Sequence, residues 1–294
     1  MTSRPMSIRP FRIDLGYDGT DFAGSQRQPG QRTVQAVVEQ ALEQLSGQPI
    51  RIALAGRTDR GVHAVGQVAS GWINWERSAD DLARALQAVT PEDVAIYGAR
   101  AVDAAFHARF SACYREYRYR ITTGSRPPLL LRRVTWHVRR PLDLERMAAA
   151  TRSLIGHRDF AAVAGKGAGV PGSPVNTVRT VSVAGWRGIP NPVERSGRIL
   201  ELQIGGDAFL PHMVRNIVGD LVAIGLGQFP PEWMDELLQN GDRRQGVAPA
   251  PPQGLVLWQV RYPDEEDNPD GTINIHRDHH VGVEDDEDVL TKGI

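Results

Sequence analysis

Apolar residues recur at two different spacings in the first hundred residues of the chain. In residues 33–47, "TVQAVVEQALEQLSG", they recur every three or four positions, which predicts an amphipathic helix that Thr33 caps and Gly47 ends. Ser78 and Asp81 have the spacing of a capping box, which predicts a second helix over 79–89. Alternating or continuous apolar positions predict four strands, at 11–19, 50–56, 67–73 and 93–102.

The same two spacings return after residue 109. They predict helices over 143–156, where Gly156 is the expected stop, and over 211–225, where Pro211 suits the first turn. Strands are expected at 114–121, 177–186, 198–206 and 254–262, and the Gly- and Pro-rich segments 164–174 and 188–197 are expected to be loops. Strands and helices therefore interleave in two comparable halves, which predicts an α+β fold with a mixed, largely antiparallel sheet.

Charge is divided unevenly along the chain. The net charge is −1, but residues 264–294 carry eleven acidic residues against two basic ones, which leaves 24 acidic and 32 basic residues in 1–263. Two explanations fit the excess of basic residues in 1–263. These residues attract a polyanionic partner, or they form an arginine-rich solvated surface. We predict an N-terminal half, 1–108, a C-terminal half, 109–263, and a disordered acidic tail, 264–294.

Composition excludes several classes of protein and site. The chain has no apolar run of 18 residues and no secretory signal, so a soluble cytoplasmic protein is expected. The single cysteine, Cys113, rules out an intrachain disulfide and a cysteine-rich metal site, and we expect it to be packed rather than nucleophilic. His276, His279 and His280 stand near acidic residues of the tail, but we predict no metal site there.

One acidic residue stands between two arginines in the segment "GRTDRGVHA", residues 56–64. If the segment is extended, Arg57 and Asp59 point to the same face and Arg60 to the other. A nearby guanidinium keeps a carboxylate ionised, which suits a nucleophile and not a general acid. On these residues alone, a turn held by an Arg–Asp ion pair is favoured over a catalytic role for Asp59.

Aromatic and basic side chains alternate in "YREYRYRI", residues 114–121. In a strand, Tyr117 and Tyr119 share one face, while Arg118 and Arg120 share the other. Aromatic rings stack on bases and arginines hold phosphates, although aromatic residues also favour strands for packing alone. The segment is therefore either an RNA-contacting strand or an ordinary core strand.

A third candidate is Arg215, near the start of the predicted helix 211–225 and off its apolar face. The N-terminus of a helix attracts anions, so an arginine there adds to a positive site. A solvent-facing arginine with no such role is the alternative. Each of these three signals is weak when it is taken alone.

Together the segments resemble a known family. "GRTDRGVHA" is similar to the signature G-R-T-D-x-G-V-H-A/G of the tRNA pseudouridine synthase A family. The resemblance runs in the same order over about residues 10–263 and also covers "YDGTDFAGSQRQ" (17–28), "FHARFSACYREYRYRI" (106–121), "FLPHMVRNIVG" (209–219) and "GLVLWQVRYP" (254–263). A match to a nine-residue pattern of fixed spacing is far more specific than a short glycine pattern.

The resemblance implies a fold and an activity. The fold is the pseudouridine-synthase α+β fold, two related halves that flank a basic cleft. The activity is the isomerisation of uridine to pseudouridine at positions 38, 39 and 40 of the tRNA anticodon stem-loop, by a homodimer that uses no metal and no cofactor. Membrane association is not expected.

The resemblance also implies roles for individual residues. Asp59 maps onto the catalytic nucleophile, which attacks either C1′ of the ribose or C6 of the base. Tyr117 maps onto the tyrosine that packs against the target base and assists proton removal from C5. Arg215 maps onto the arginine that pairs with the nucleophile, so we expect an ion pair across the cleft, with no second acid in reach of Asp59. We assign substrate binding to Arg57, Arg60, Arg118 and Tyr119, and a structural role to His63.

The chain departs from the family pattern at three positions. After Gly24 the family commonly has Trp, and this chain has Ser25. The family usually has an aromatic residue near the position of Val163, and often an aromatic residue or His at the position of Pro211. These changes are expected to affect contacts with the RNA or the choice of modified position. None falls on Asp59, Tyr117 or Arg215.

Two other functions compete with this hypothesis. A non-catalytic RNA chaperone on the same fold would bind tRNA equally well without Asp59. A glycoside hydrolase that uses Asp59 would need a second carboxylate opposite it, and the signature segment offers none.

Overall fold

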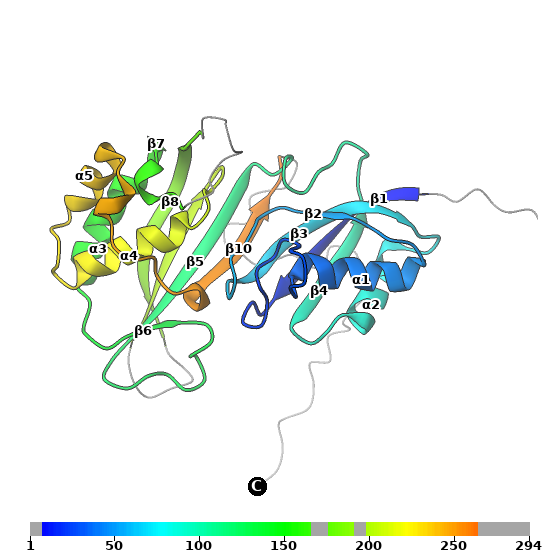
Figure 1. Ribbon diagram of the computed structural model, residues 1–294, viewed down its shortest axis with the longest axis horizontal. Coiled ribbons are helices and arrows are strands. Elements are labelled where there is room, and N and C mark those ends of the chain that lie inside the picture. The colour runs from blue at the N-terminus through cyan, green and yellow to red at the C-terminus, as the bar shows by residue number, and fades with distance from the viewer. Residues whose placement is uncertain (1–7, 166–175, 191–197, 264–294) are drawn as a thin grey trace, which may run out of the picture.

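The computed structural model describes residues 8–165, 176–190 and 198–263. Its strands are β1 (Ile8–Tyr17), β2 (Ile52–Leu54), β3 (His63–Asn74), β4 (Val94–Ala101), β5 (Tyr114–Thr123), β6 (Trp136–Val138), β7 (Gly156–Asp159), β8 (Val178–Ile189), β9 (Arg198–Gly206) and β10 (Leu255–Arg261). They form one ten-stranded sheet in the order β4-β1-β3-β10-β5-β9-β8-β7, with β2 beside β3 and β6 beside β5 (Figure 1). The predicted acidic tail and its three histidines lie outside the described residues.

The strand β10 joins the two halves of the sheet. It pairs parallel with β3, where Val256 is opposite His63, and antiparallel with β5, where Val256 is opposite Arg118. Gly66 permits this junction, because a Cβ atom there would lie 2.2 Å from the carbonyl oxygen of Trp258. Among the described strands, only β3–β10 and β5–β6 pair in parallel, so the predicted α+β fold with a largely antiparallel sheet is confirmed. The exact division at residues 108/109 stays a prediction.

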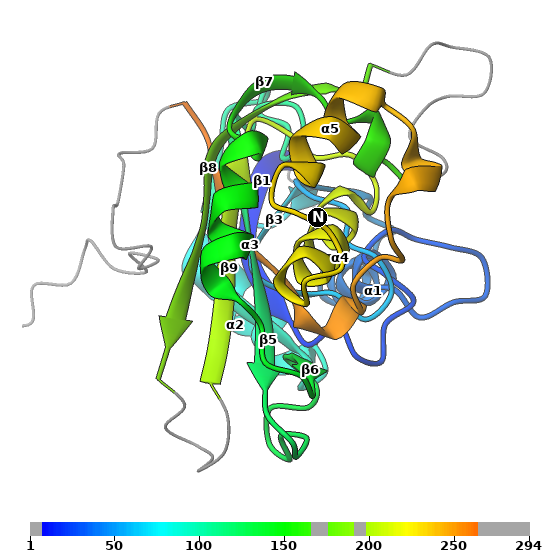
Figure 2. The same cartoon turned by 90° about the vertical axis from the view of Figure 1, so that its left-hand side faces the viewer.

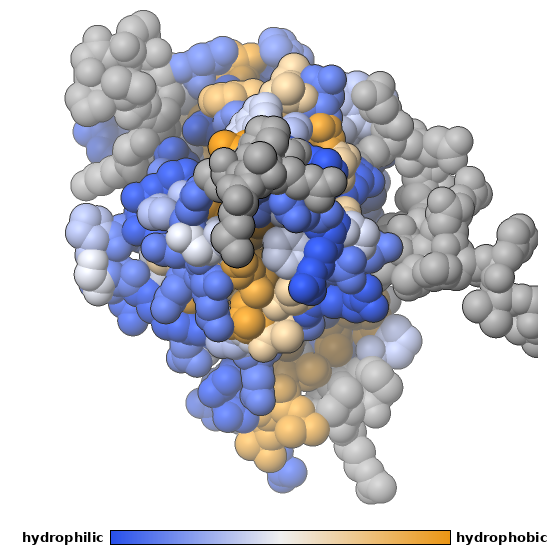
Figure 3. Space-filling view, turned by 90° about the vertical axis from the view of Figure 1, so that its right-hand side faces the viewer, coloured by the Kyte–Doolittle hydropathy of each residue, from blue (hydrophilic) through white to orange (hydrophobic). Residues whose placement is uncertain are grey.

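The helices lie in two groups beside the sheet. In the N-terminal half, α1 (Val34–Ser46) and α2 (Ala79–Val89) accompany β1 to β4. In the C-terminal half, α3 (Leu144–Thr151), α4 (Met213–Gly225) and α5 (Trp233–Asn240) lie on one side of β5, β8 and β9 (Figure 2). Hydrophilic residues cover most of the end of the molecule formed by the N-terminal half (Figure 3). Buried apolar side chains from both halves form a single continuous core.

Local signals fixed the ends of the first two helices as predicted. The hydroxyl of Thr33 accepts a hydrogen bond from the backbone N–H of Ala36, and Gly47 ends α1 in the left-handed conformation at φ 72°. At α2 the side chains of Ser78 and Asp81 make both bonds of a capping box. These ends are decided by neighbouring residues, so they could be inferred without the rest of the fold.

Two other helices begin or end differently from the prediction. The helix α3 stops at Thr151, and a 3₁₀ turn carries the chain to Gly156, whose φ of 112° starts β7. The helix α4 begins at Met213 and not at Pro211, because His212 has a left-handed φ of 60°. The short elements β6, β7 and α5 were not predicted.

The expectation for Cys113 was wrong. Its side chain is exposed, and its thiol donates a hydrogen bond to the carbonyl oxygen of Arg261 at 3.4 Å. Cys113 immediately precedes β5, and its backbone N–H is already paired with the same carbonyl.

None of the helices in the described part of the chain is long and apolar enough to cross a membrane. Within those residues there is also no group of three or more His, Cys, Asp and Glu side chains placed to hold a metal ion.

Candidate active site

The segment that carries Asp59 is a bend held from several sides. After β2 ends, the side chain of Gln67 on β3 accepts from the N–H of Gly56 at 3.1 Å and donates to its carbonyl at 2.8 Å. Gln67 is fully buried, so these bonds replace the strand pairing that the bend gives up. The segment is thereby fixed in place although it is not hydrogen-bonded as a strand of the sheet.

Ser25 holds the next residue of the bend. It is fully buried, and its hydroxyl accepts from the N–H of Thr58 at 2.8 Å while its own N–H donates to the carbonyl of Thr58 at 3.0 Å. The hydroxyl of Thr58 also bonds that of Tyr17 at 2.9 Å. Here the departure from the family's Trp supports the backbone beside Asp59, a contact that the sequence alone did not reveal.

Asp59 is ion-paired with a residue from the other half of the chain. Its Oδ2 accepts a hydrogen bond from Nη1 of Arg215 at 3.0 Å, and its side chain stays 32% exposed. Arg215 is itself oriented, because its Nε donates to the carbonyl of Ala250 at 2.8 Å and its carbonyl accepts from the N–H of Ala250 at 2.9 Å. The predicted ion pair is confirmed, and neither Arg57 nor Arg60 pairs with Asp59.

An open cavity of about 1220 Å³ contains this ion pair. Residues of both halves line it, including Asp59, Tyr117, Phe209, His212 and six arginines: Arg57, Arg60, Arg109, Arg115, Arg179 and Arg215. Within the described residues, Asp59 is the only carboxylate in its lining. The cavity is therefore a positively charged site built around a single anionic group.

Tyr117 on β5 forms part of the apolar wall of this cavity. Its ring contacts Phe209 edge-on, with ring centroids 5.1 Å apart. Burial raises the pKa of the Tyr117 hydroxyl well above the usual range for tyrosine, and the nearby hydroxyl of Tyr17 acts in the same direction. The hydroxyl therefore stays protonated at neutral pH.

Arg57 and Arg60 lie at the mouth of the cavity and are exposed. Although Arg57 is exposed, partial loss of solvent around its guanidinium and the positive charge of Arg109 lower its pKa. An arginine nevertheless stays protonated in proteins. None of Arg57, Arg60 and Arg109 forms an ion pair with a carboxylate among the described residues. Positive charge that no acid neutralises favours an anionic ligand.

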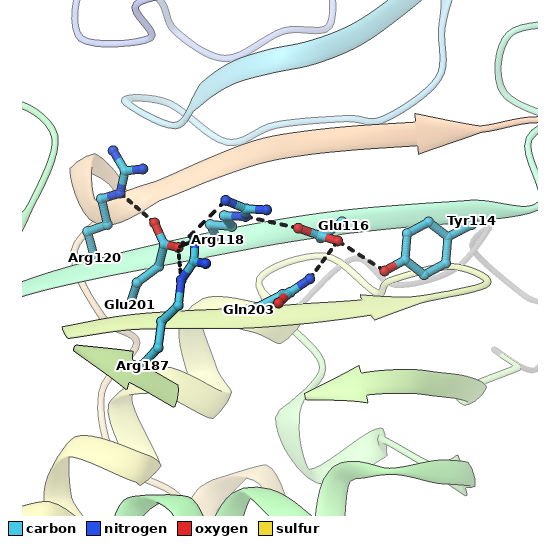
Figure 4. Close-up of polar contacts among 7 residues, drawn as sticks. All are labelled: Tyr114, Glu116, Arg118, Arg120, Arg187, Glu201 and Gln203. Carbon is cyan, nitrogen blue, oxygen red and sulfur yellow. Dashed lines mark hydrogen bonds and ion pairs between the residues drawn. The ribbon is translucent and has the colours of Figure 1, made fainter. Parts of the chain in front are cut away.

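The other two proposed substrate contacts lie elsewhere. Tyr119 is fully buried, and its hydroxyl donates to the carbonyl of Pro251 at 2.7 Å. Arg118 points to the opposite face of β5, where it pairs with Glu116 at 2.9 Å and Glu201 at 3.7 Å (Figure 4). Neither lines the cavity, so their substrate roles stay predictions that this placement does not support.

His63 is held by two hydrogen bonds. Its Nδ1 accepts from the N–H of Gly19 at 3.0 Å, and its Nε2 lies 2.8 Å from the carbonyl oxygen of Arg133. Its side chain is almost fully buried. Both contacts fit the structural role that the sequence suggested.

His212 is a site residue that the sequence did not single out. Its Nε2 lies 3.7 Å from Oδ1 of Asp59, whereas Arg215 pairs with Oδ2 of the same carboxylate. Its position directly before the helix that carries Arg215 was visible in "FLPHMVRNIVG", but its left-handed backbone was not. Phe209 was also missed, because its contact with Tyr117 joins two segments of the C-terminal half that are far apart in the sequence.

The loop that orients Arg215 is anchored by a buried carboxylate further along α4. Asp220 is fully buried, and its Oδ1 accepts from the N–H of Val247 at 2.7 Å. Gly219 lets the loop approach, since a Cβ atom there would lie 2.3 Å from the carbonyl oxygen of Ala248. Burial raises the pKa of Asp220 to about 6, against the smaller opposing effects of the Val247 N–H and the charge of Arg243.

This raised pKa predicts a pH-dependent stability. Between its ordinary value of 3.8 and about 6, folded Asp220 keeps a proton that the unfolded chain releases. The stabilisation is complete below the lower value and is lost as the pH rises through the upper one. Asparagine cannot ionise, so Asp220→Asn lacks this pH dependence. As the pH rises from about 4 to about 8, we expect the free energy of unfolding of the variant to increase by about 2–3 kcal/mol relative to that of the unsubstituted protein. Urea unfolding across this range measures the effect; parallel pH profiles for the two proteins would contradict it.

The chain is similar to known proteins along most of its length. The family model described as tRNA pseudouridine synthase matches residues 16–111 and 150–263. A protein of Nitrosococcus oceani named tRNA pseudouridine synthase A is 43% identical over 262 residues, which is 88% of this chain and 96% of that protein. Proteins of the same name from Shewanella amazonensis and Methylococcus capsulatus are each 42% identical, over 86% and 87% of this chain and 94% and 91% of theirs. With this coverage and the cavity around Asp59, the chain belongs to the tRNA pseudouridine synthase family.

Proposed function

We propose that this protein isomerises uridine to pseudouridine in tRNA, with Asp59 as the nucleophile. One observation carries the proposal beyond family membership: a single carboxylate, paired with Arg215 across the two halves, stands in a cavity lined by six arginines. The arginines suit a phosphate backbone, and the carboxylate is the one acidic group that they surround. The reaction itself redistributes bonds within one nucleotide and needs no oxidant, reductant or phosphoryl donor.

The geometry supports a base flipped into the cavity. A base inside a stem or loop must leave its stack to reach a buried group, which costs a few kcal/mol. Stacking on an aromatic ring returns about 1–3 kcal/mol, and Tyr117, backed by Phe209, offers such a ring. Arg215 gives the Asp59 carboxylate a charge-assisted hydrogen bond that can persist while the base displaces water from the cavity.

The anticodon stem-loop, at positions 38, 39 and 40, is the substrate that we propose within tRNA. It rests on the resemblance of the signature segments and on the exposed arginines at the cavity mouth, Arg57, Arg60 and Arg109. Mapping of pseudouridine in unmodified tRNA after incubation with the protein tests it. Modification confined to other positions would reject this assignment but keep the activity.

The resemblance further leads us to propose a homodimer that works in the cytoplasm. Sedimentation of the purified full chain tests the oligomeric state, and a monomer at all concentrations would reject the dimer. The competing hydrolase hypothesis has little support, because that class needs a second carboxylate and Asp59 is alone among the described residues of the cavity. A non-catalytic RNA chaperone would bind tRNA and leave its uridines unchanged.

The unneutralised arginines predict a salt-dependent affinity for tRNA. We expect the Kd to rise at least about tenfold between about 50 and about 200 mM salt, because bound phosphates release counterions. Changing Arg57 and Arg109 together to Gln should lower the slope of log Kd against log salt by about 1–2. Filter binding with one tRNA at several salt concentrations measures both. Arg84→Gln, an exposed arginine of α2 already paired with Asp81, is the matched control and should keep the full slope.

A further inference from the structure

The proposed isomerisation needs a group that moves a proton. The bond between C1′ and N1 breaks with its electron pair left on N1, and a bond forms between C1′ and C5. C5 then loses its proton, and the electron pair of that C–H bond restores the C5–C6 double bond. N1 gains one proton, so no net proton is consumed, but a side chain or solvent must hold the proton between the two atoms.

Most titratable groups of the cavity are unsuited to this task. The six arginines keep their protons in proteins, and Tyr117 has its pKa raised by burial, so its hydroxyl does not ionise near neutral pH. Asp59 is committed to the carbon that it attacks and is held by Arg215. Of the titratable side chains in the described lining, His212 is the one left, and histidine is the side chain suited to exchanging protons at physiological pH.

The position of His212 fits this role. Its Nε2 lies 3.7 Å from Oδ1 of Asp59, and its side chain is 44% exposed, so the ring faces open space beside the nucleophile. Apart from Asp59, no described residue forms a hydrogen bond or an ion pair with its ring. His63, which does not line the cavity, provides a contrast, because both of its ring nitrogens are occupied by backbone groups.

The backbone of His212 is unusual in a way that supports a functional role. It is the only non-glycine residue with a positive φ among the described residues, at 60°. Glycine and asparagine occupy this region more readily, so the conformation alone does not call for a histidine. Gly165 makes room for it, since a Cβ atom there would lie 2.9 Å from the Cβ of His212, and its N–H donates to the carbonyl of Pro211 at 2.8 Å.

We propose that His212 is a catalytic residue whose Nε2 takes the proton from C5 of the target base and returns a proton to N1. The inference rests on the proposed function and adds the group that takes up the proton from C5 and supplies one to N1. Asp59, held by Arg215, forms a transient bond to carbon and later breaks it with the electron pair returning to its oxygen, while His212 carries the proton. Tyr117 keeps only its stacking role.

Two substitutions separate chemistry from backbone structure. His212→Gly and His212→Asn both suit the left-handed backbone, so each is expected to fold, and neither carries a group that exchanges protons. We expect pseudouridine formation in a single turnover to slow by about 10²–10⁴-fold in both, with the Kd for tRNA unchanged. Added imidazole should restore the rate of His212→Gly in proportion to its concentration, and deuterium at C5 should slow the variants more than the unsubstituted enzyme.

The controls distinguish the possible failures. Imidazole should not rescue Asp59→Asn, which lacks the nucleophile. Near-normal rates in both His212 variants would overturn the proposal. A slow His212→Gly that imidazole does not rescue, with no larger isotope effect at C5, would also overturn it, because the residue would then act only on structure. If the unsubstituted protein binds tRNA but forms no pseudouridine, the proposed function fails and this inference fails with it.

Discussion

Asp59→Asn is expected to reduce pseudouridine formation in tRNA by at least about 10⁴-fold, because an amide is a poor nucleophile and the cavity holds no second carboxylate among its described lining residues. The substitution keeps the size of the side chain and an oxygen that accepts from Arg215, so the fold should persist. Affinity for tRNA should stay the same or increase, since one negative charge leaves a site surrounded by arginines. Single-turnover conversion of one unmodified tRNA, with binding measured on the same sample, tests both statements.

Asp80→Asn is the matched control for this prediction. It removes an exposed carboxylate from the first turn of α2, on the surface of the N-terminal half, and should leave the rate unchanged. If Asp59→Asn kept normal activity, the role of Asp59 would be wrong while the activity stood. Equal binding of tRNA by both variants, with no pseudouridine from any of the proteins, would instead favour the RNA-chaperone hypothesis.

Arg215→Met should produce the second large effect, a loss of about 10²–10³-fold in the single-turnover rate. Arg215 gives Asp59 a charge-assisted hydrogen bond at 3.0 Å and also donates to the carbonyl of Ala250 at 2.8 Å. Without it, Asp59 loses its charge-assisted hydrogen bond, and the Ala250 carbonyl loses a donor. The measurement is the single-turnover rate of the variant beside that of the unsubstituted enzyme.

Arg215→Lys tests the geometry of the same contact. Lysine keeps the charge but lacks the planar fork that reaches Asp59 and Ala250 together, so an intermediate rate is expected. Thermal unfolding of both variants shows whether the loop at Ala250 is still in place. A rate for Arg215→Met equal to that of the unsubstituted enzyme would show that the ion pair does not maintain the nucleophile.

The sequence predicted the parts of this molecule that neighbouring residues decide. The ends of α1 and α2 depend on Thr33, Gly47 and the Ser78–Asp81 pair, and all lie within a few positions of what they cap. The ion pair between Asp59 and Arg215 was predicted from the resemblance of two distant segments, since nothing in either segment alone identifies its partner.

Other features depended on how strands and loops meet in space. Alternation placed Tyr117 and Tyr119 on one face of β5, but it did not show that the carbonyl of Pro251 accepts from Tyr119 and places that residue in the core. The part played by Ser25 required the contact with Thr58, which lies 33 positions away. His212 was missed because a left-handed residue just before a helix leaves no hydrophobic pattern in the sequence.

The place of β10 has a consequence for the order in which the protein becomes active during its synthesis. This strand is the last described element of the chain, yet it lies between β3, which follows Asp59, and β5, which carries Tyr117. A ribosome-bound chain that ends before Leu255 can hold the two halves only as unjoined pieces of sheet, with Asp59 and Arg215 on different pieces. Catalytic competence therefore waits until β10 has been synthesised, and a product truncated before Leu255 would carry every proposed catalytic residue without an assembled site.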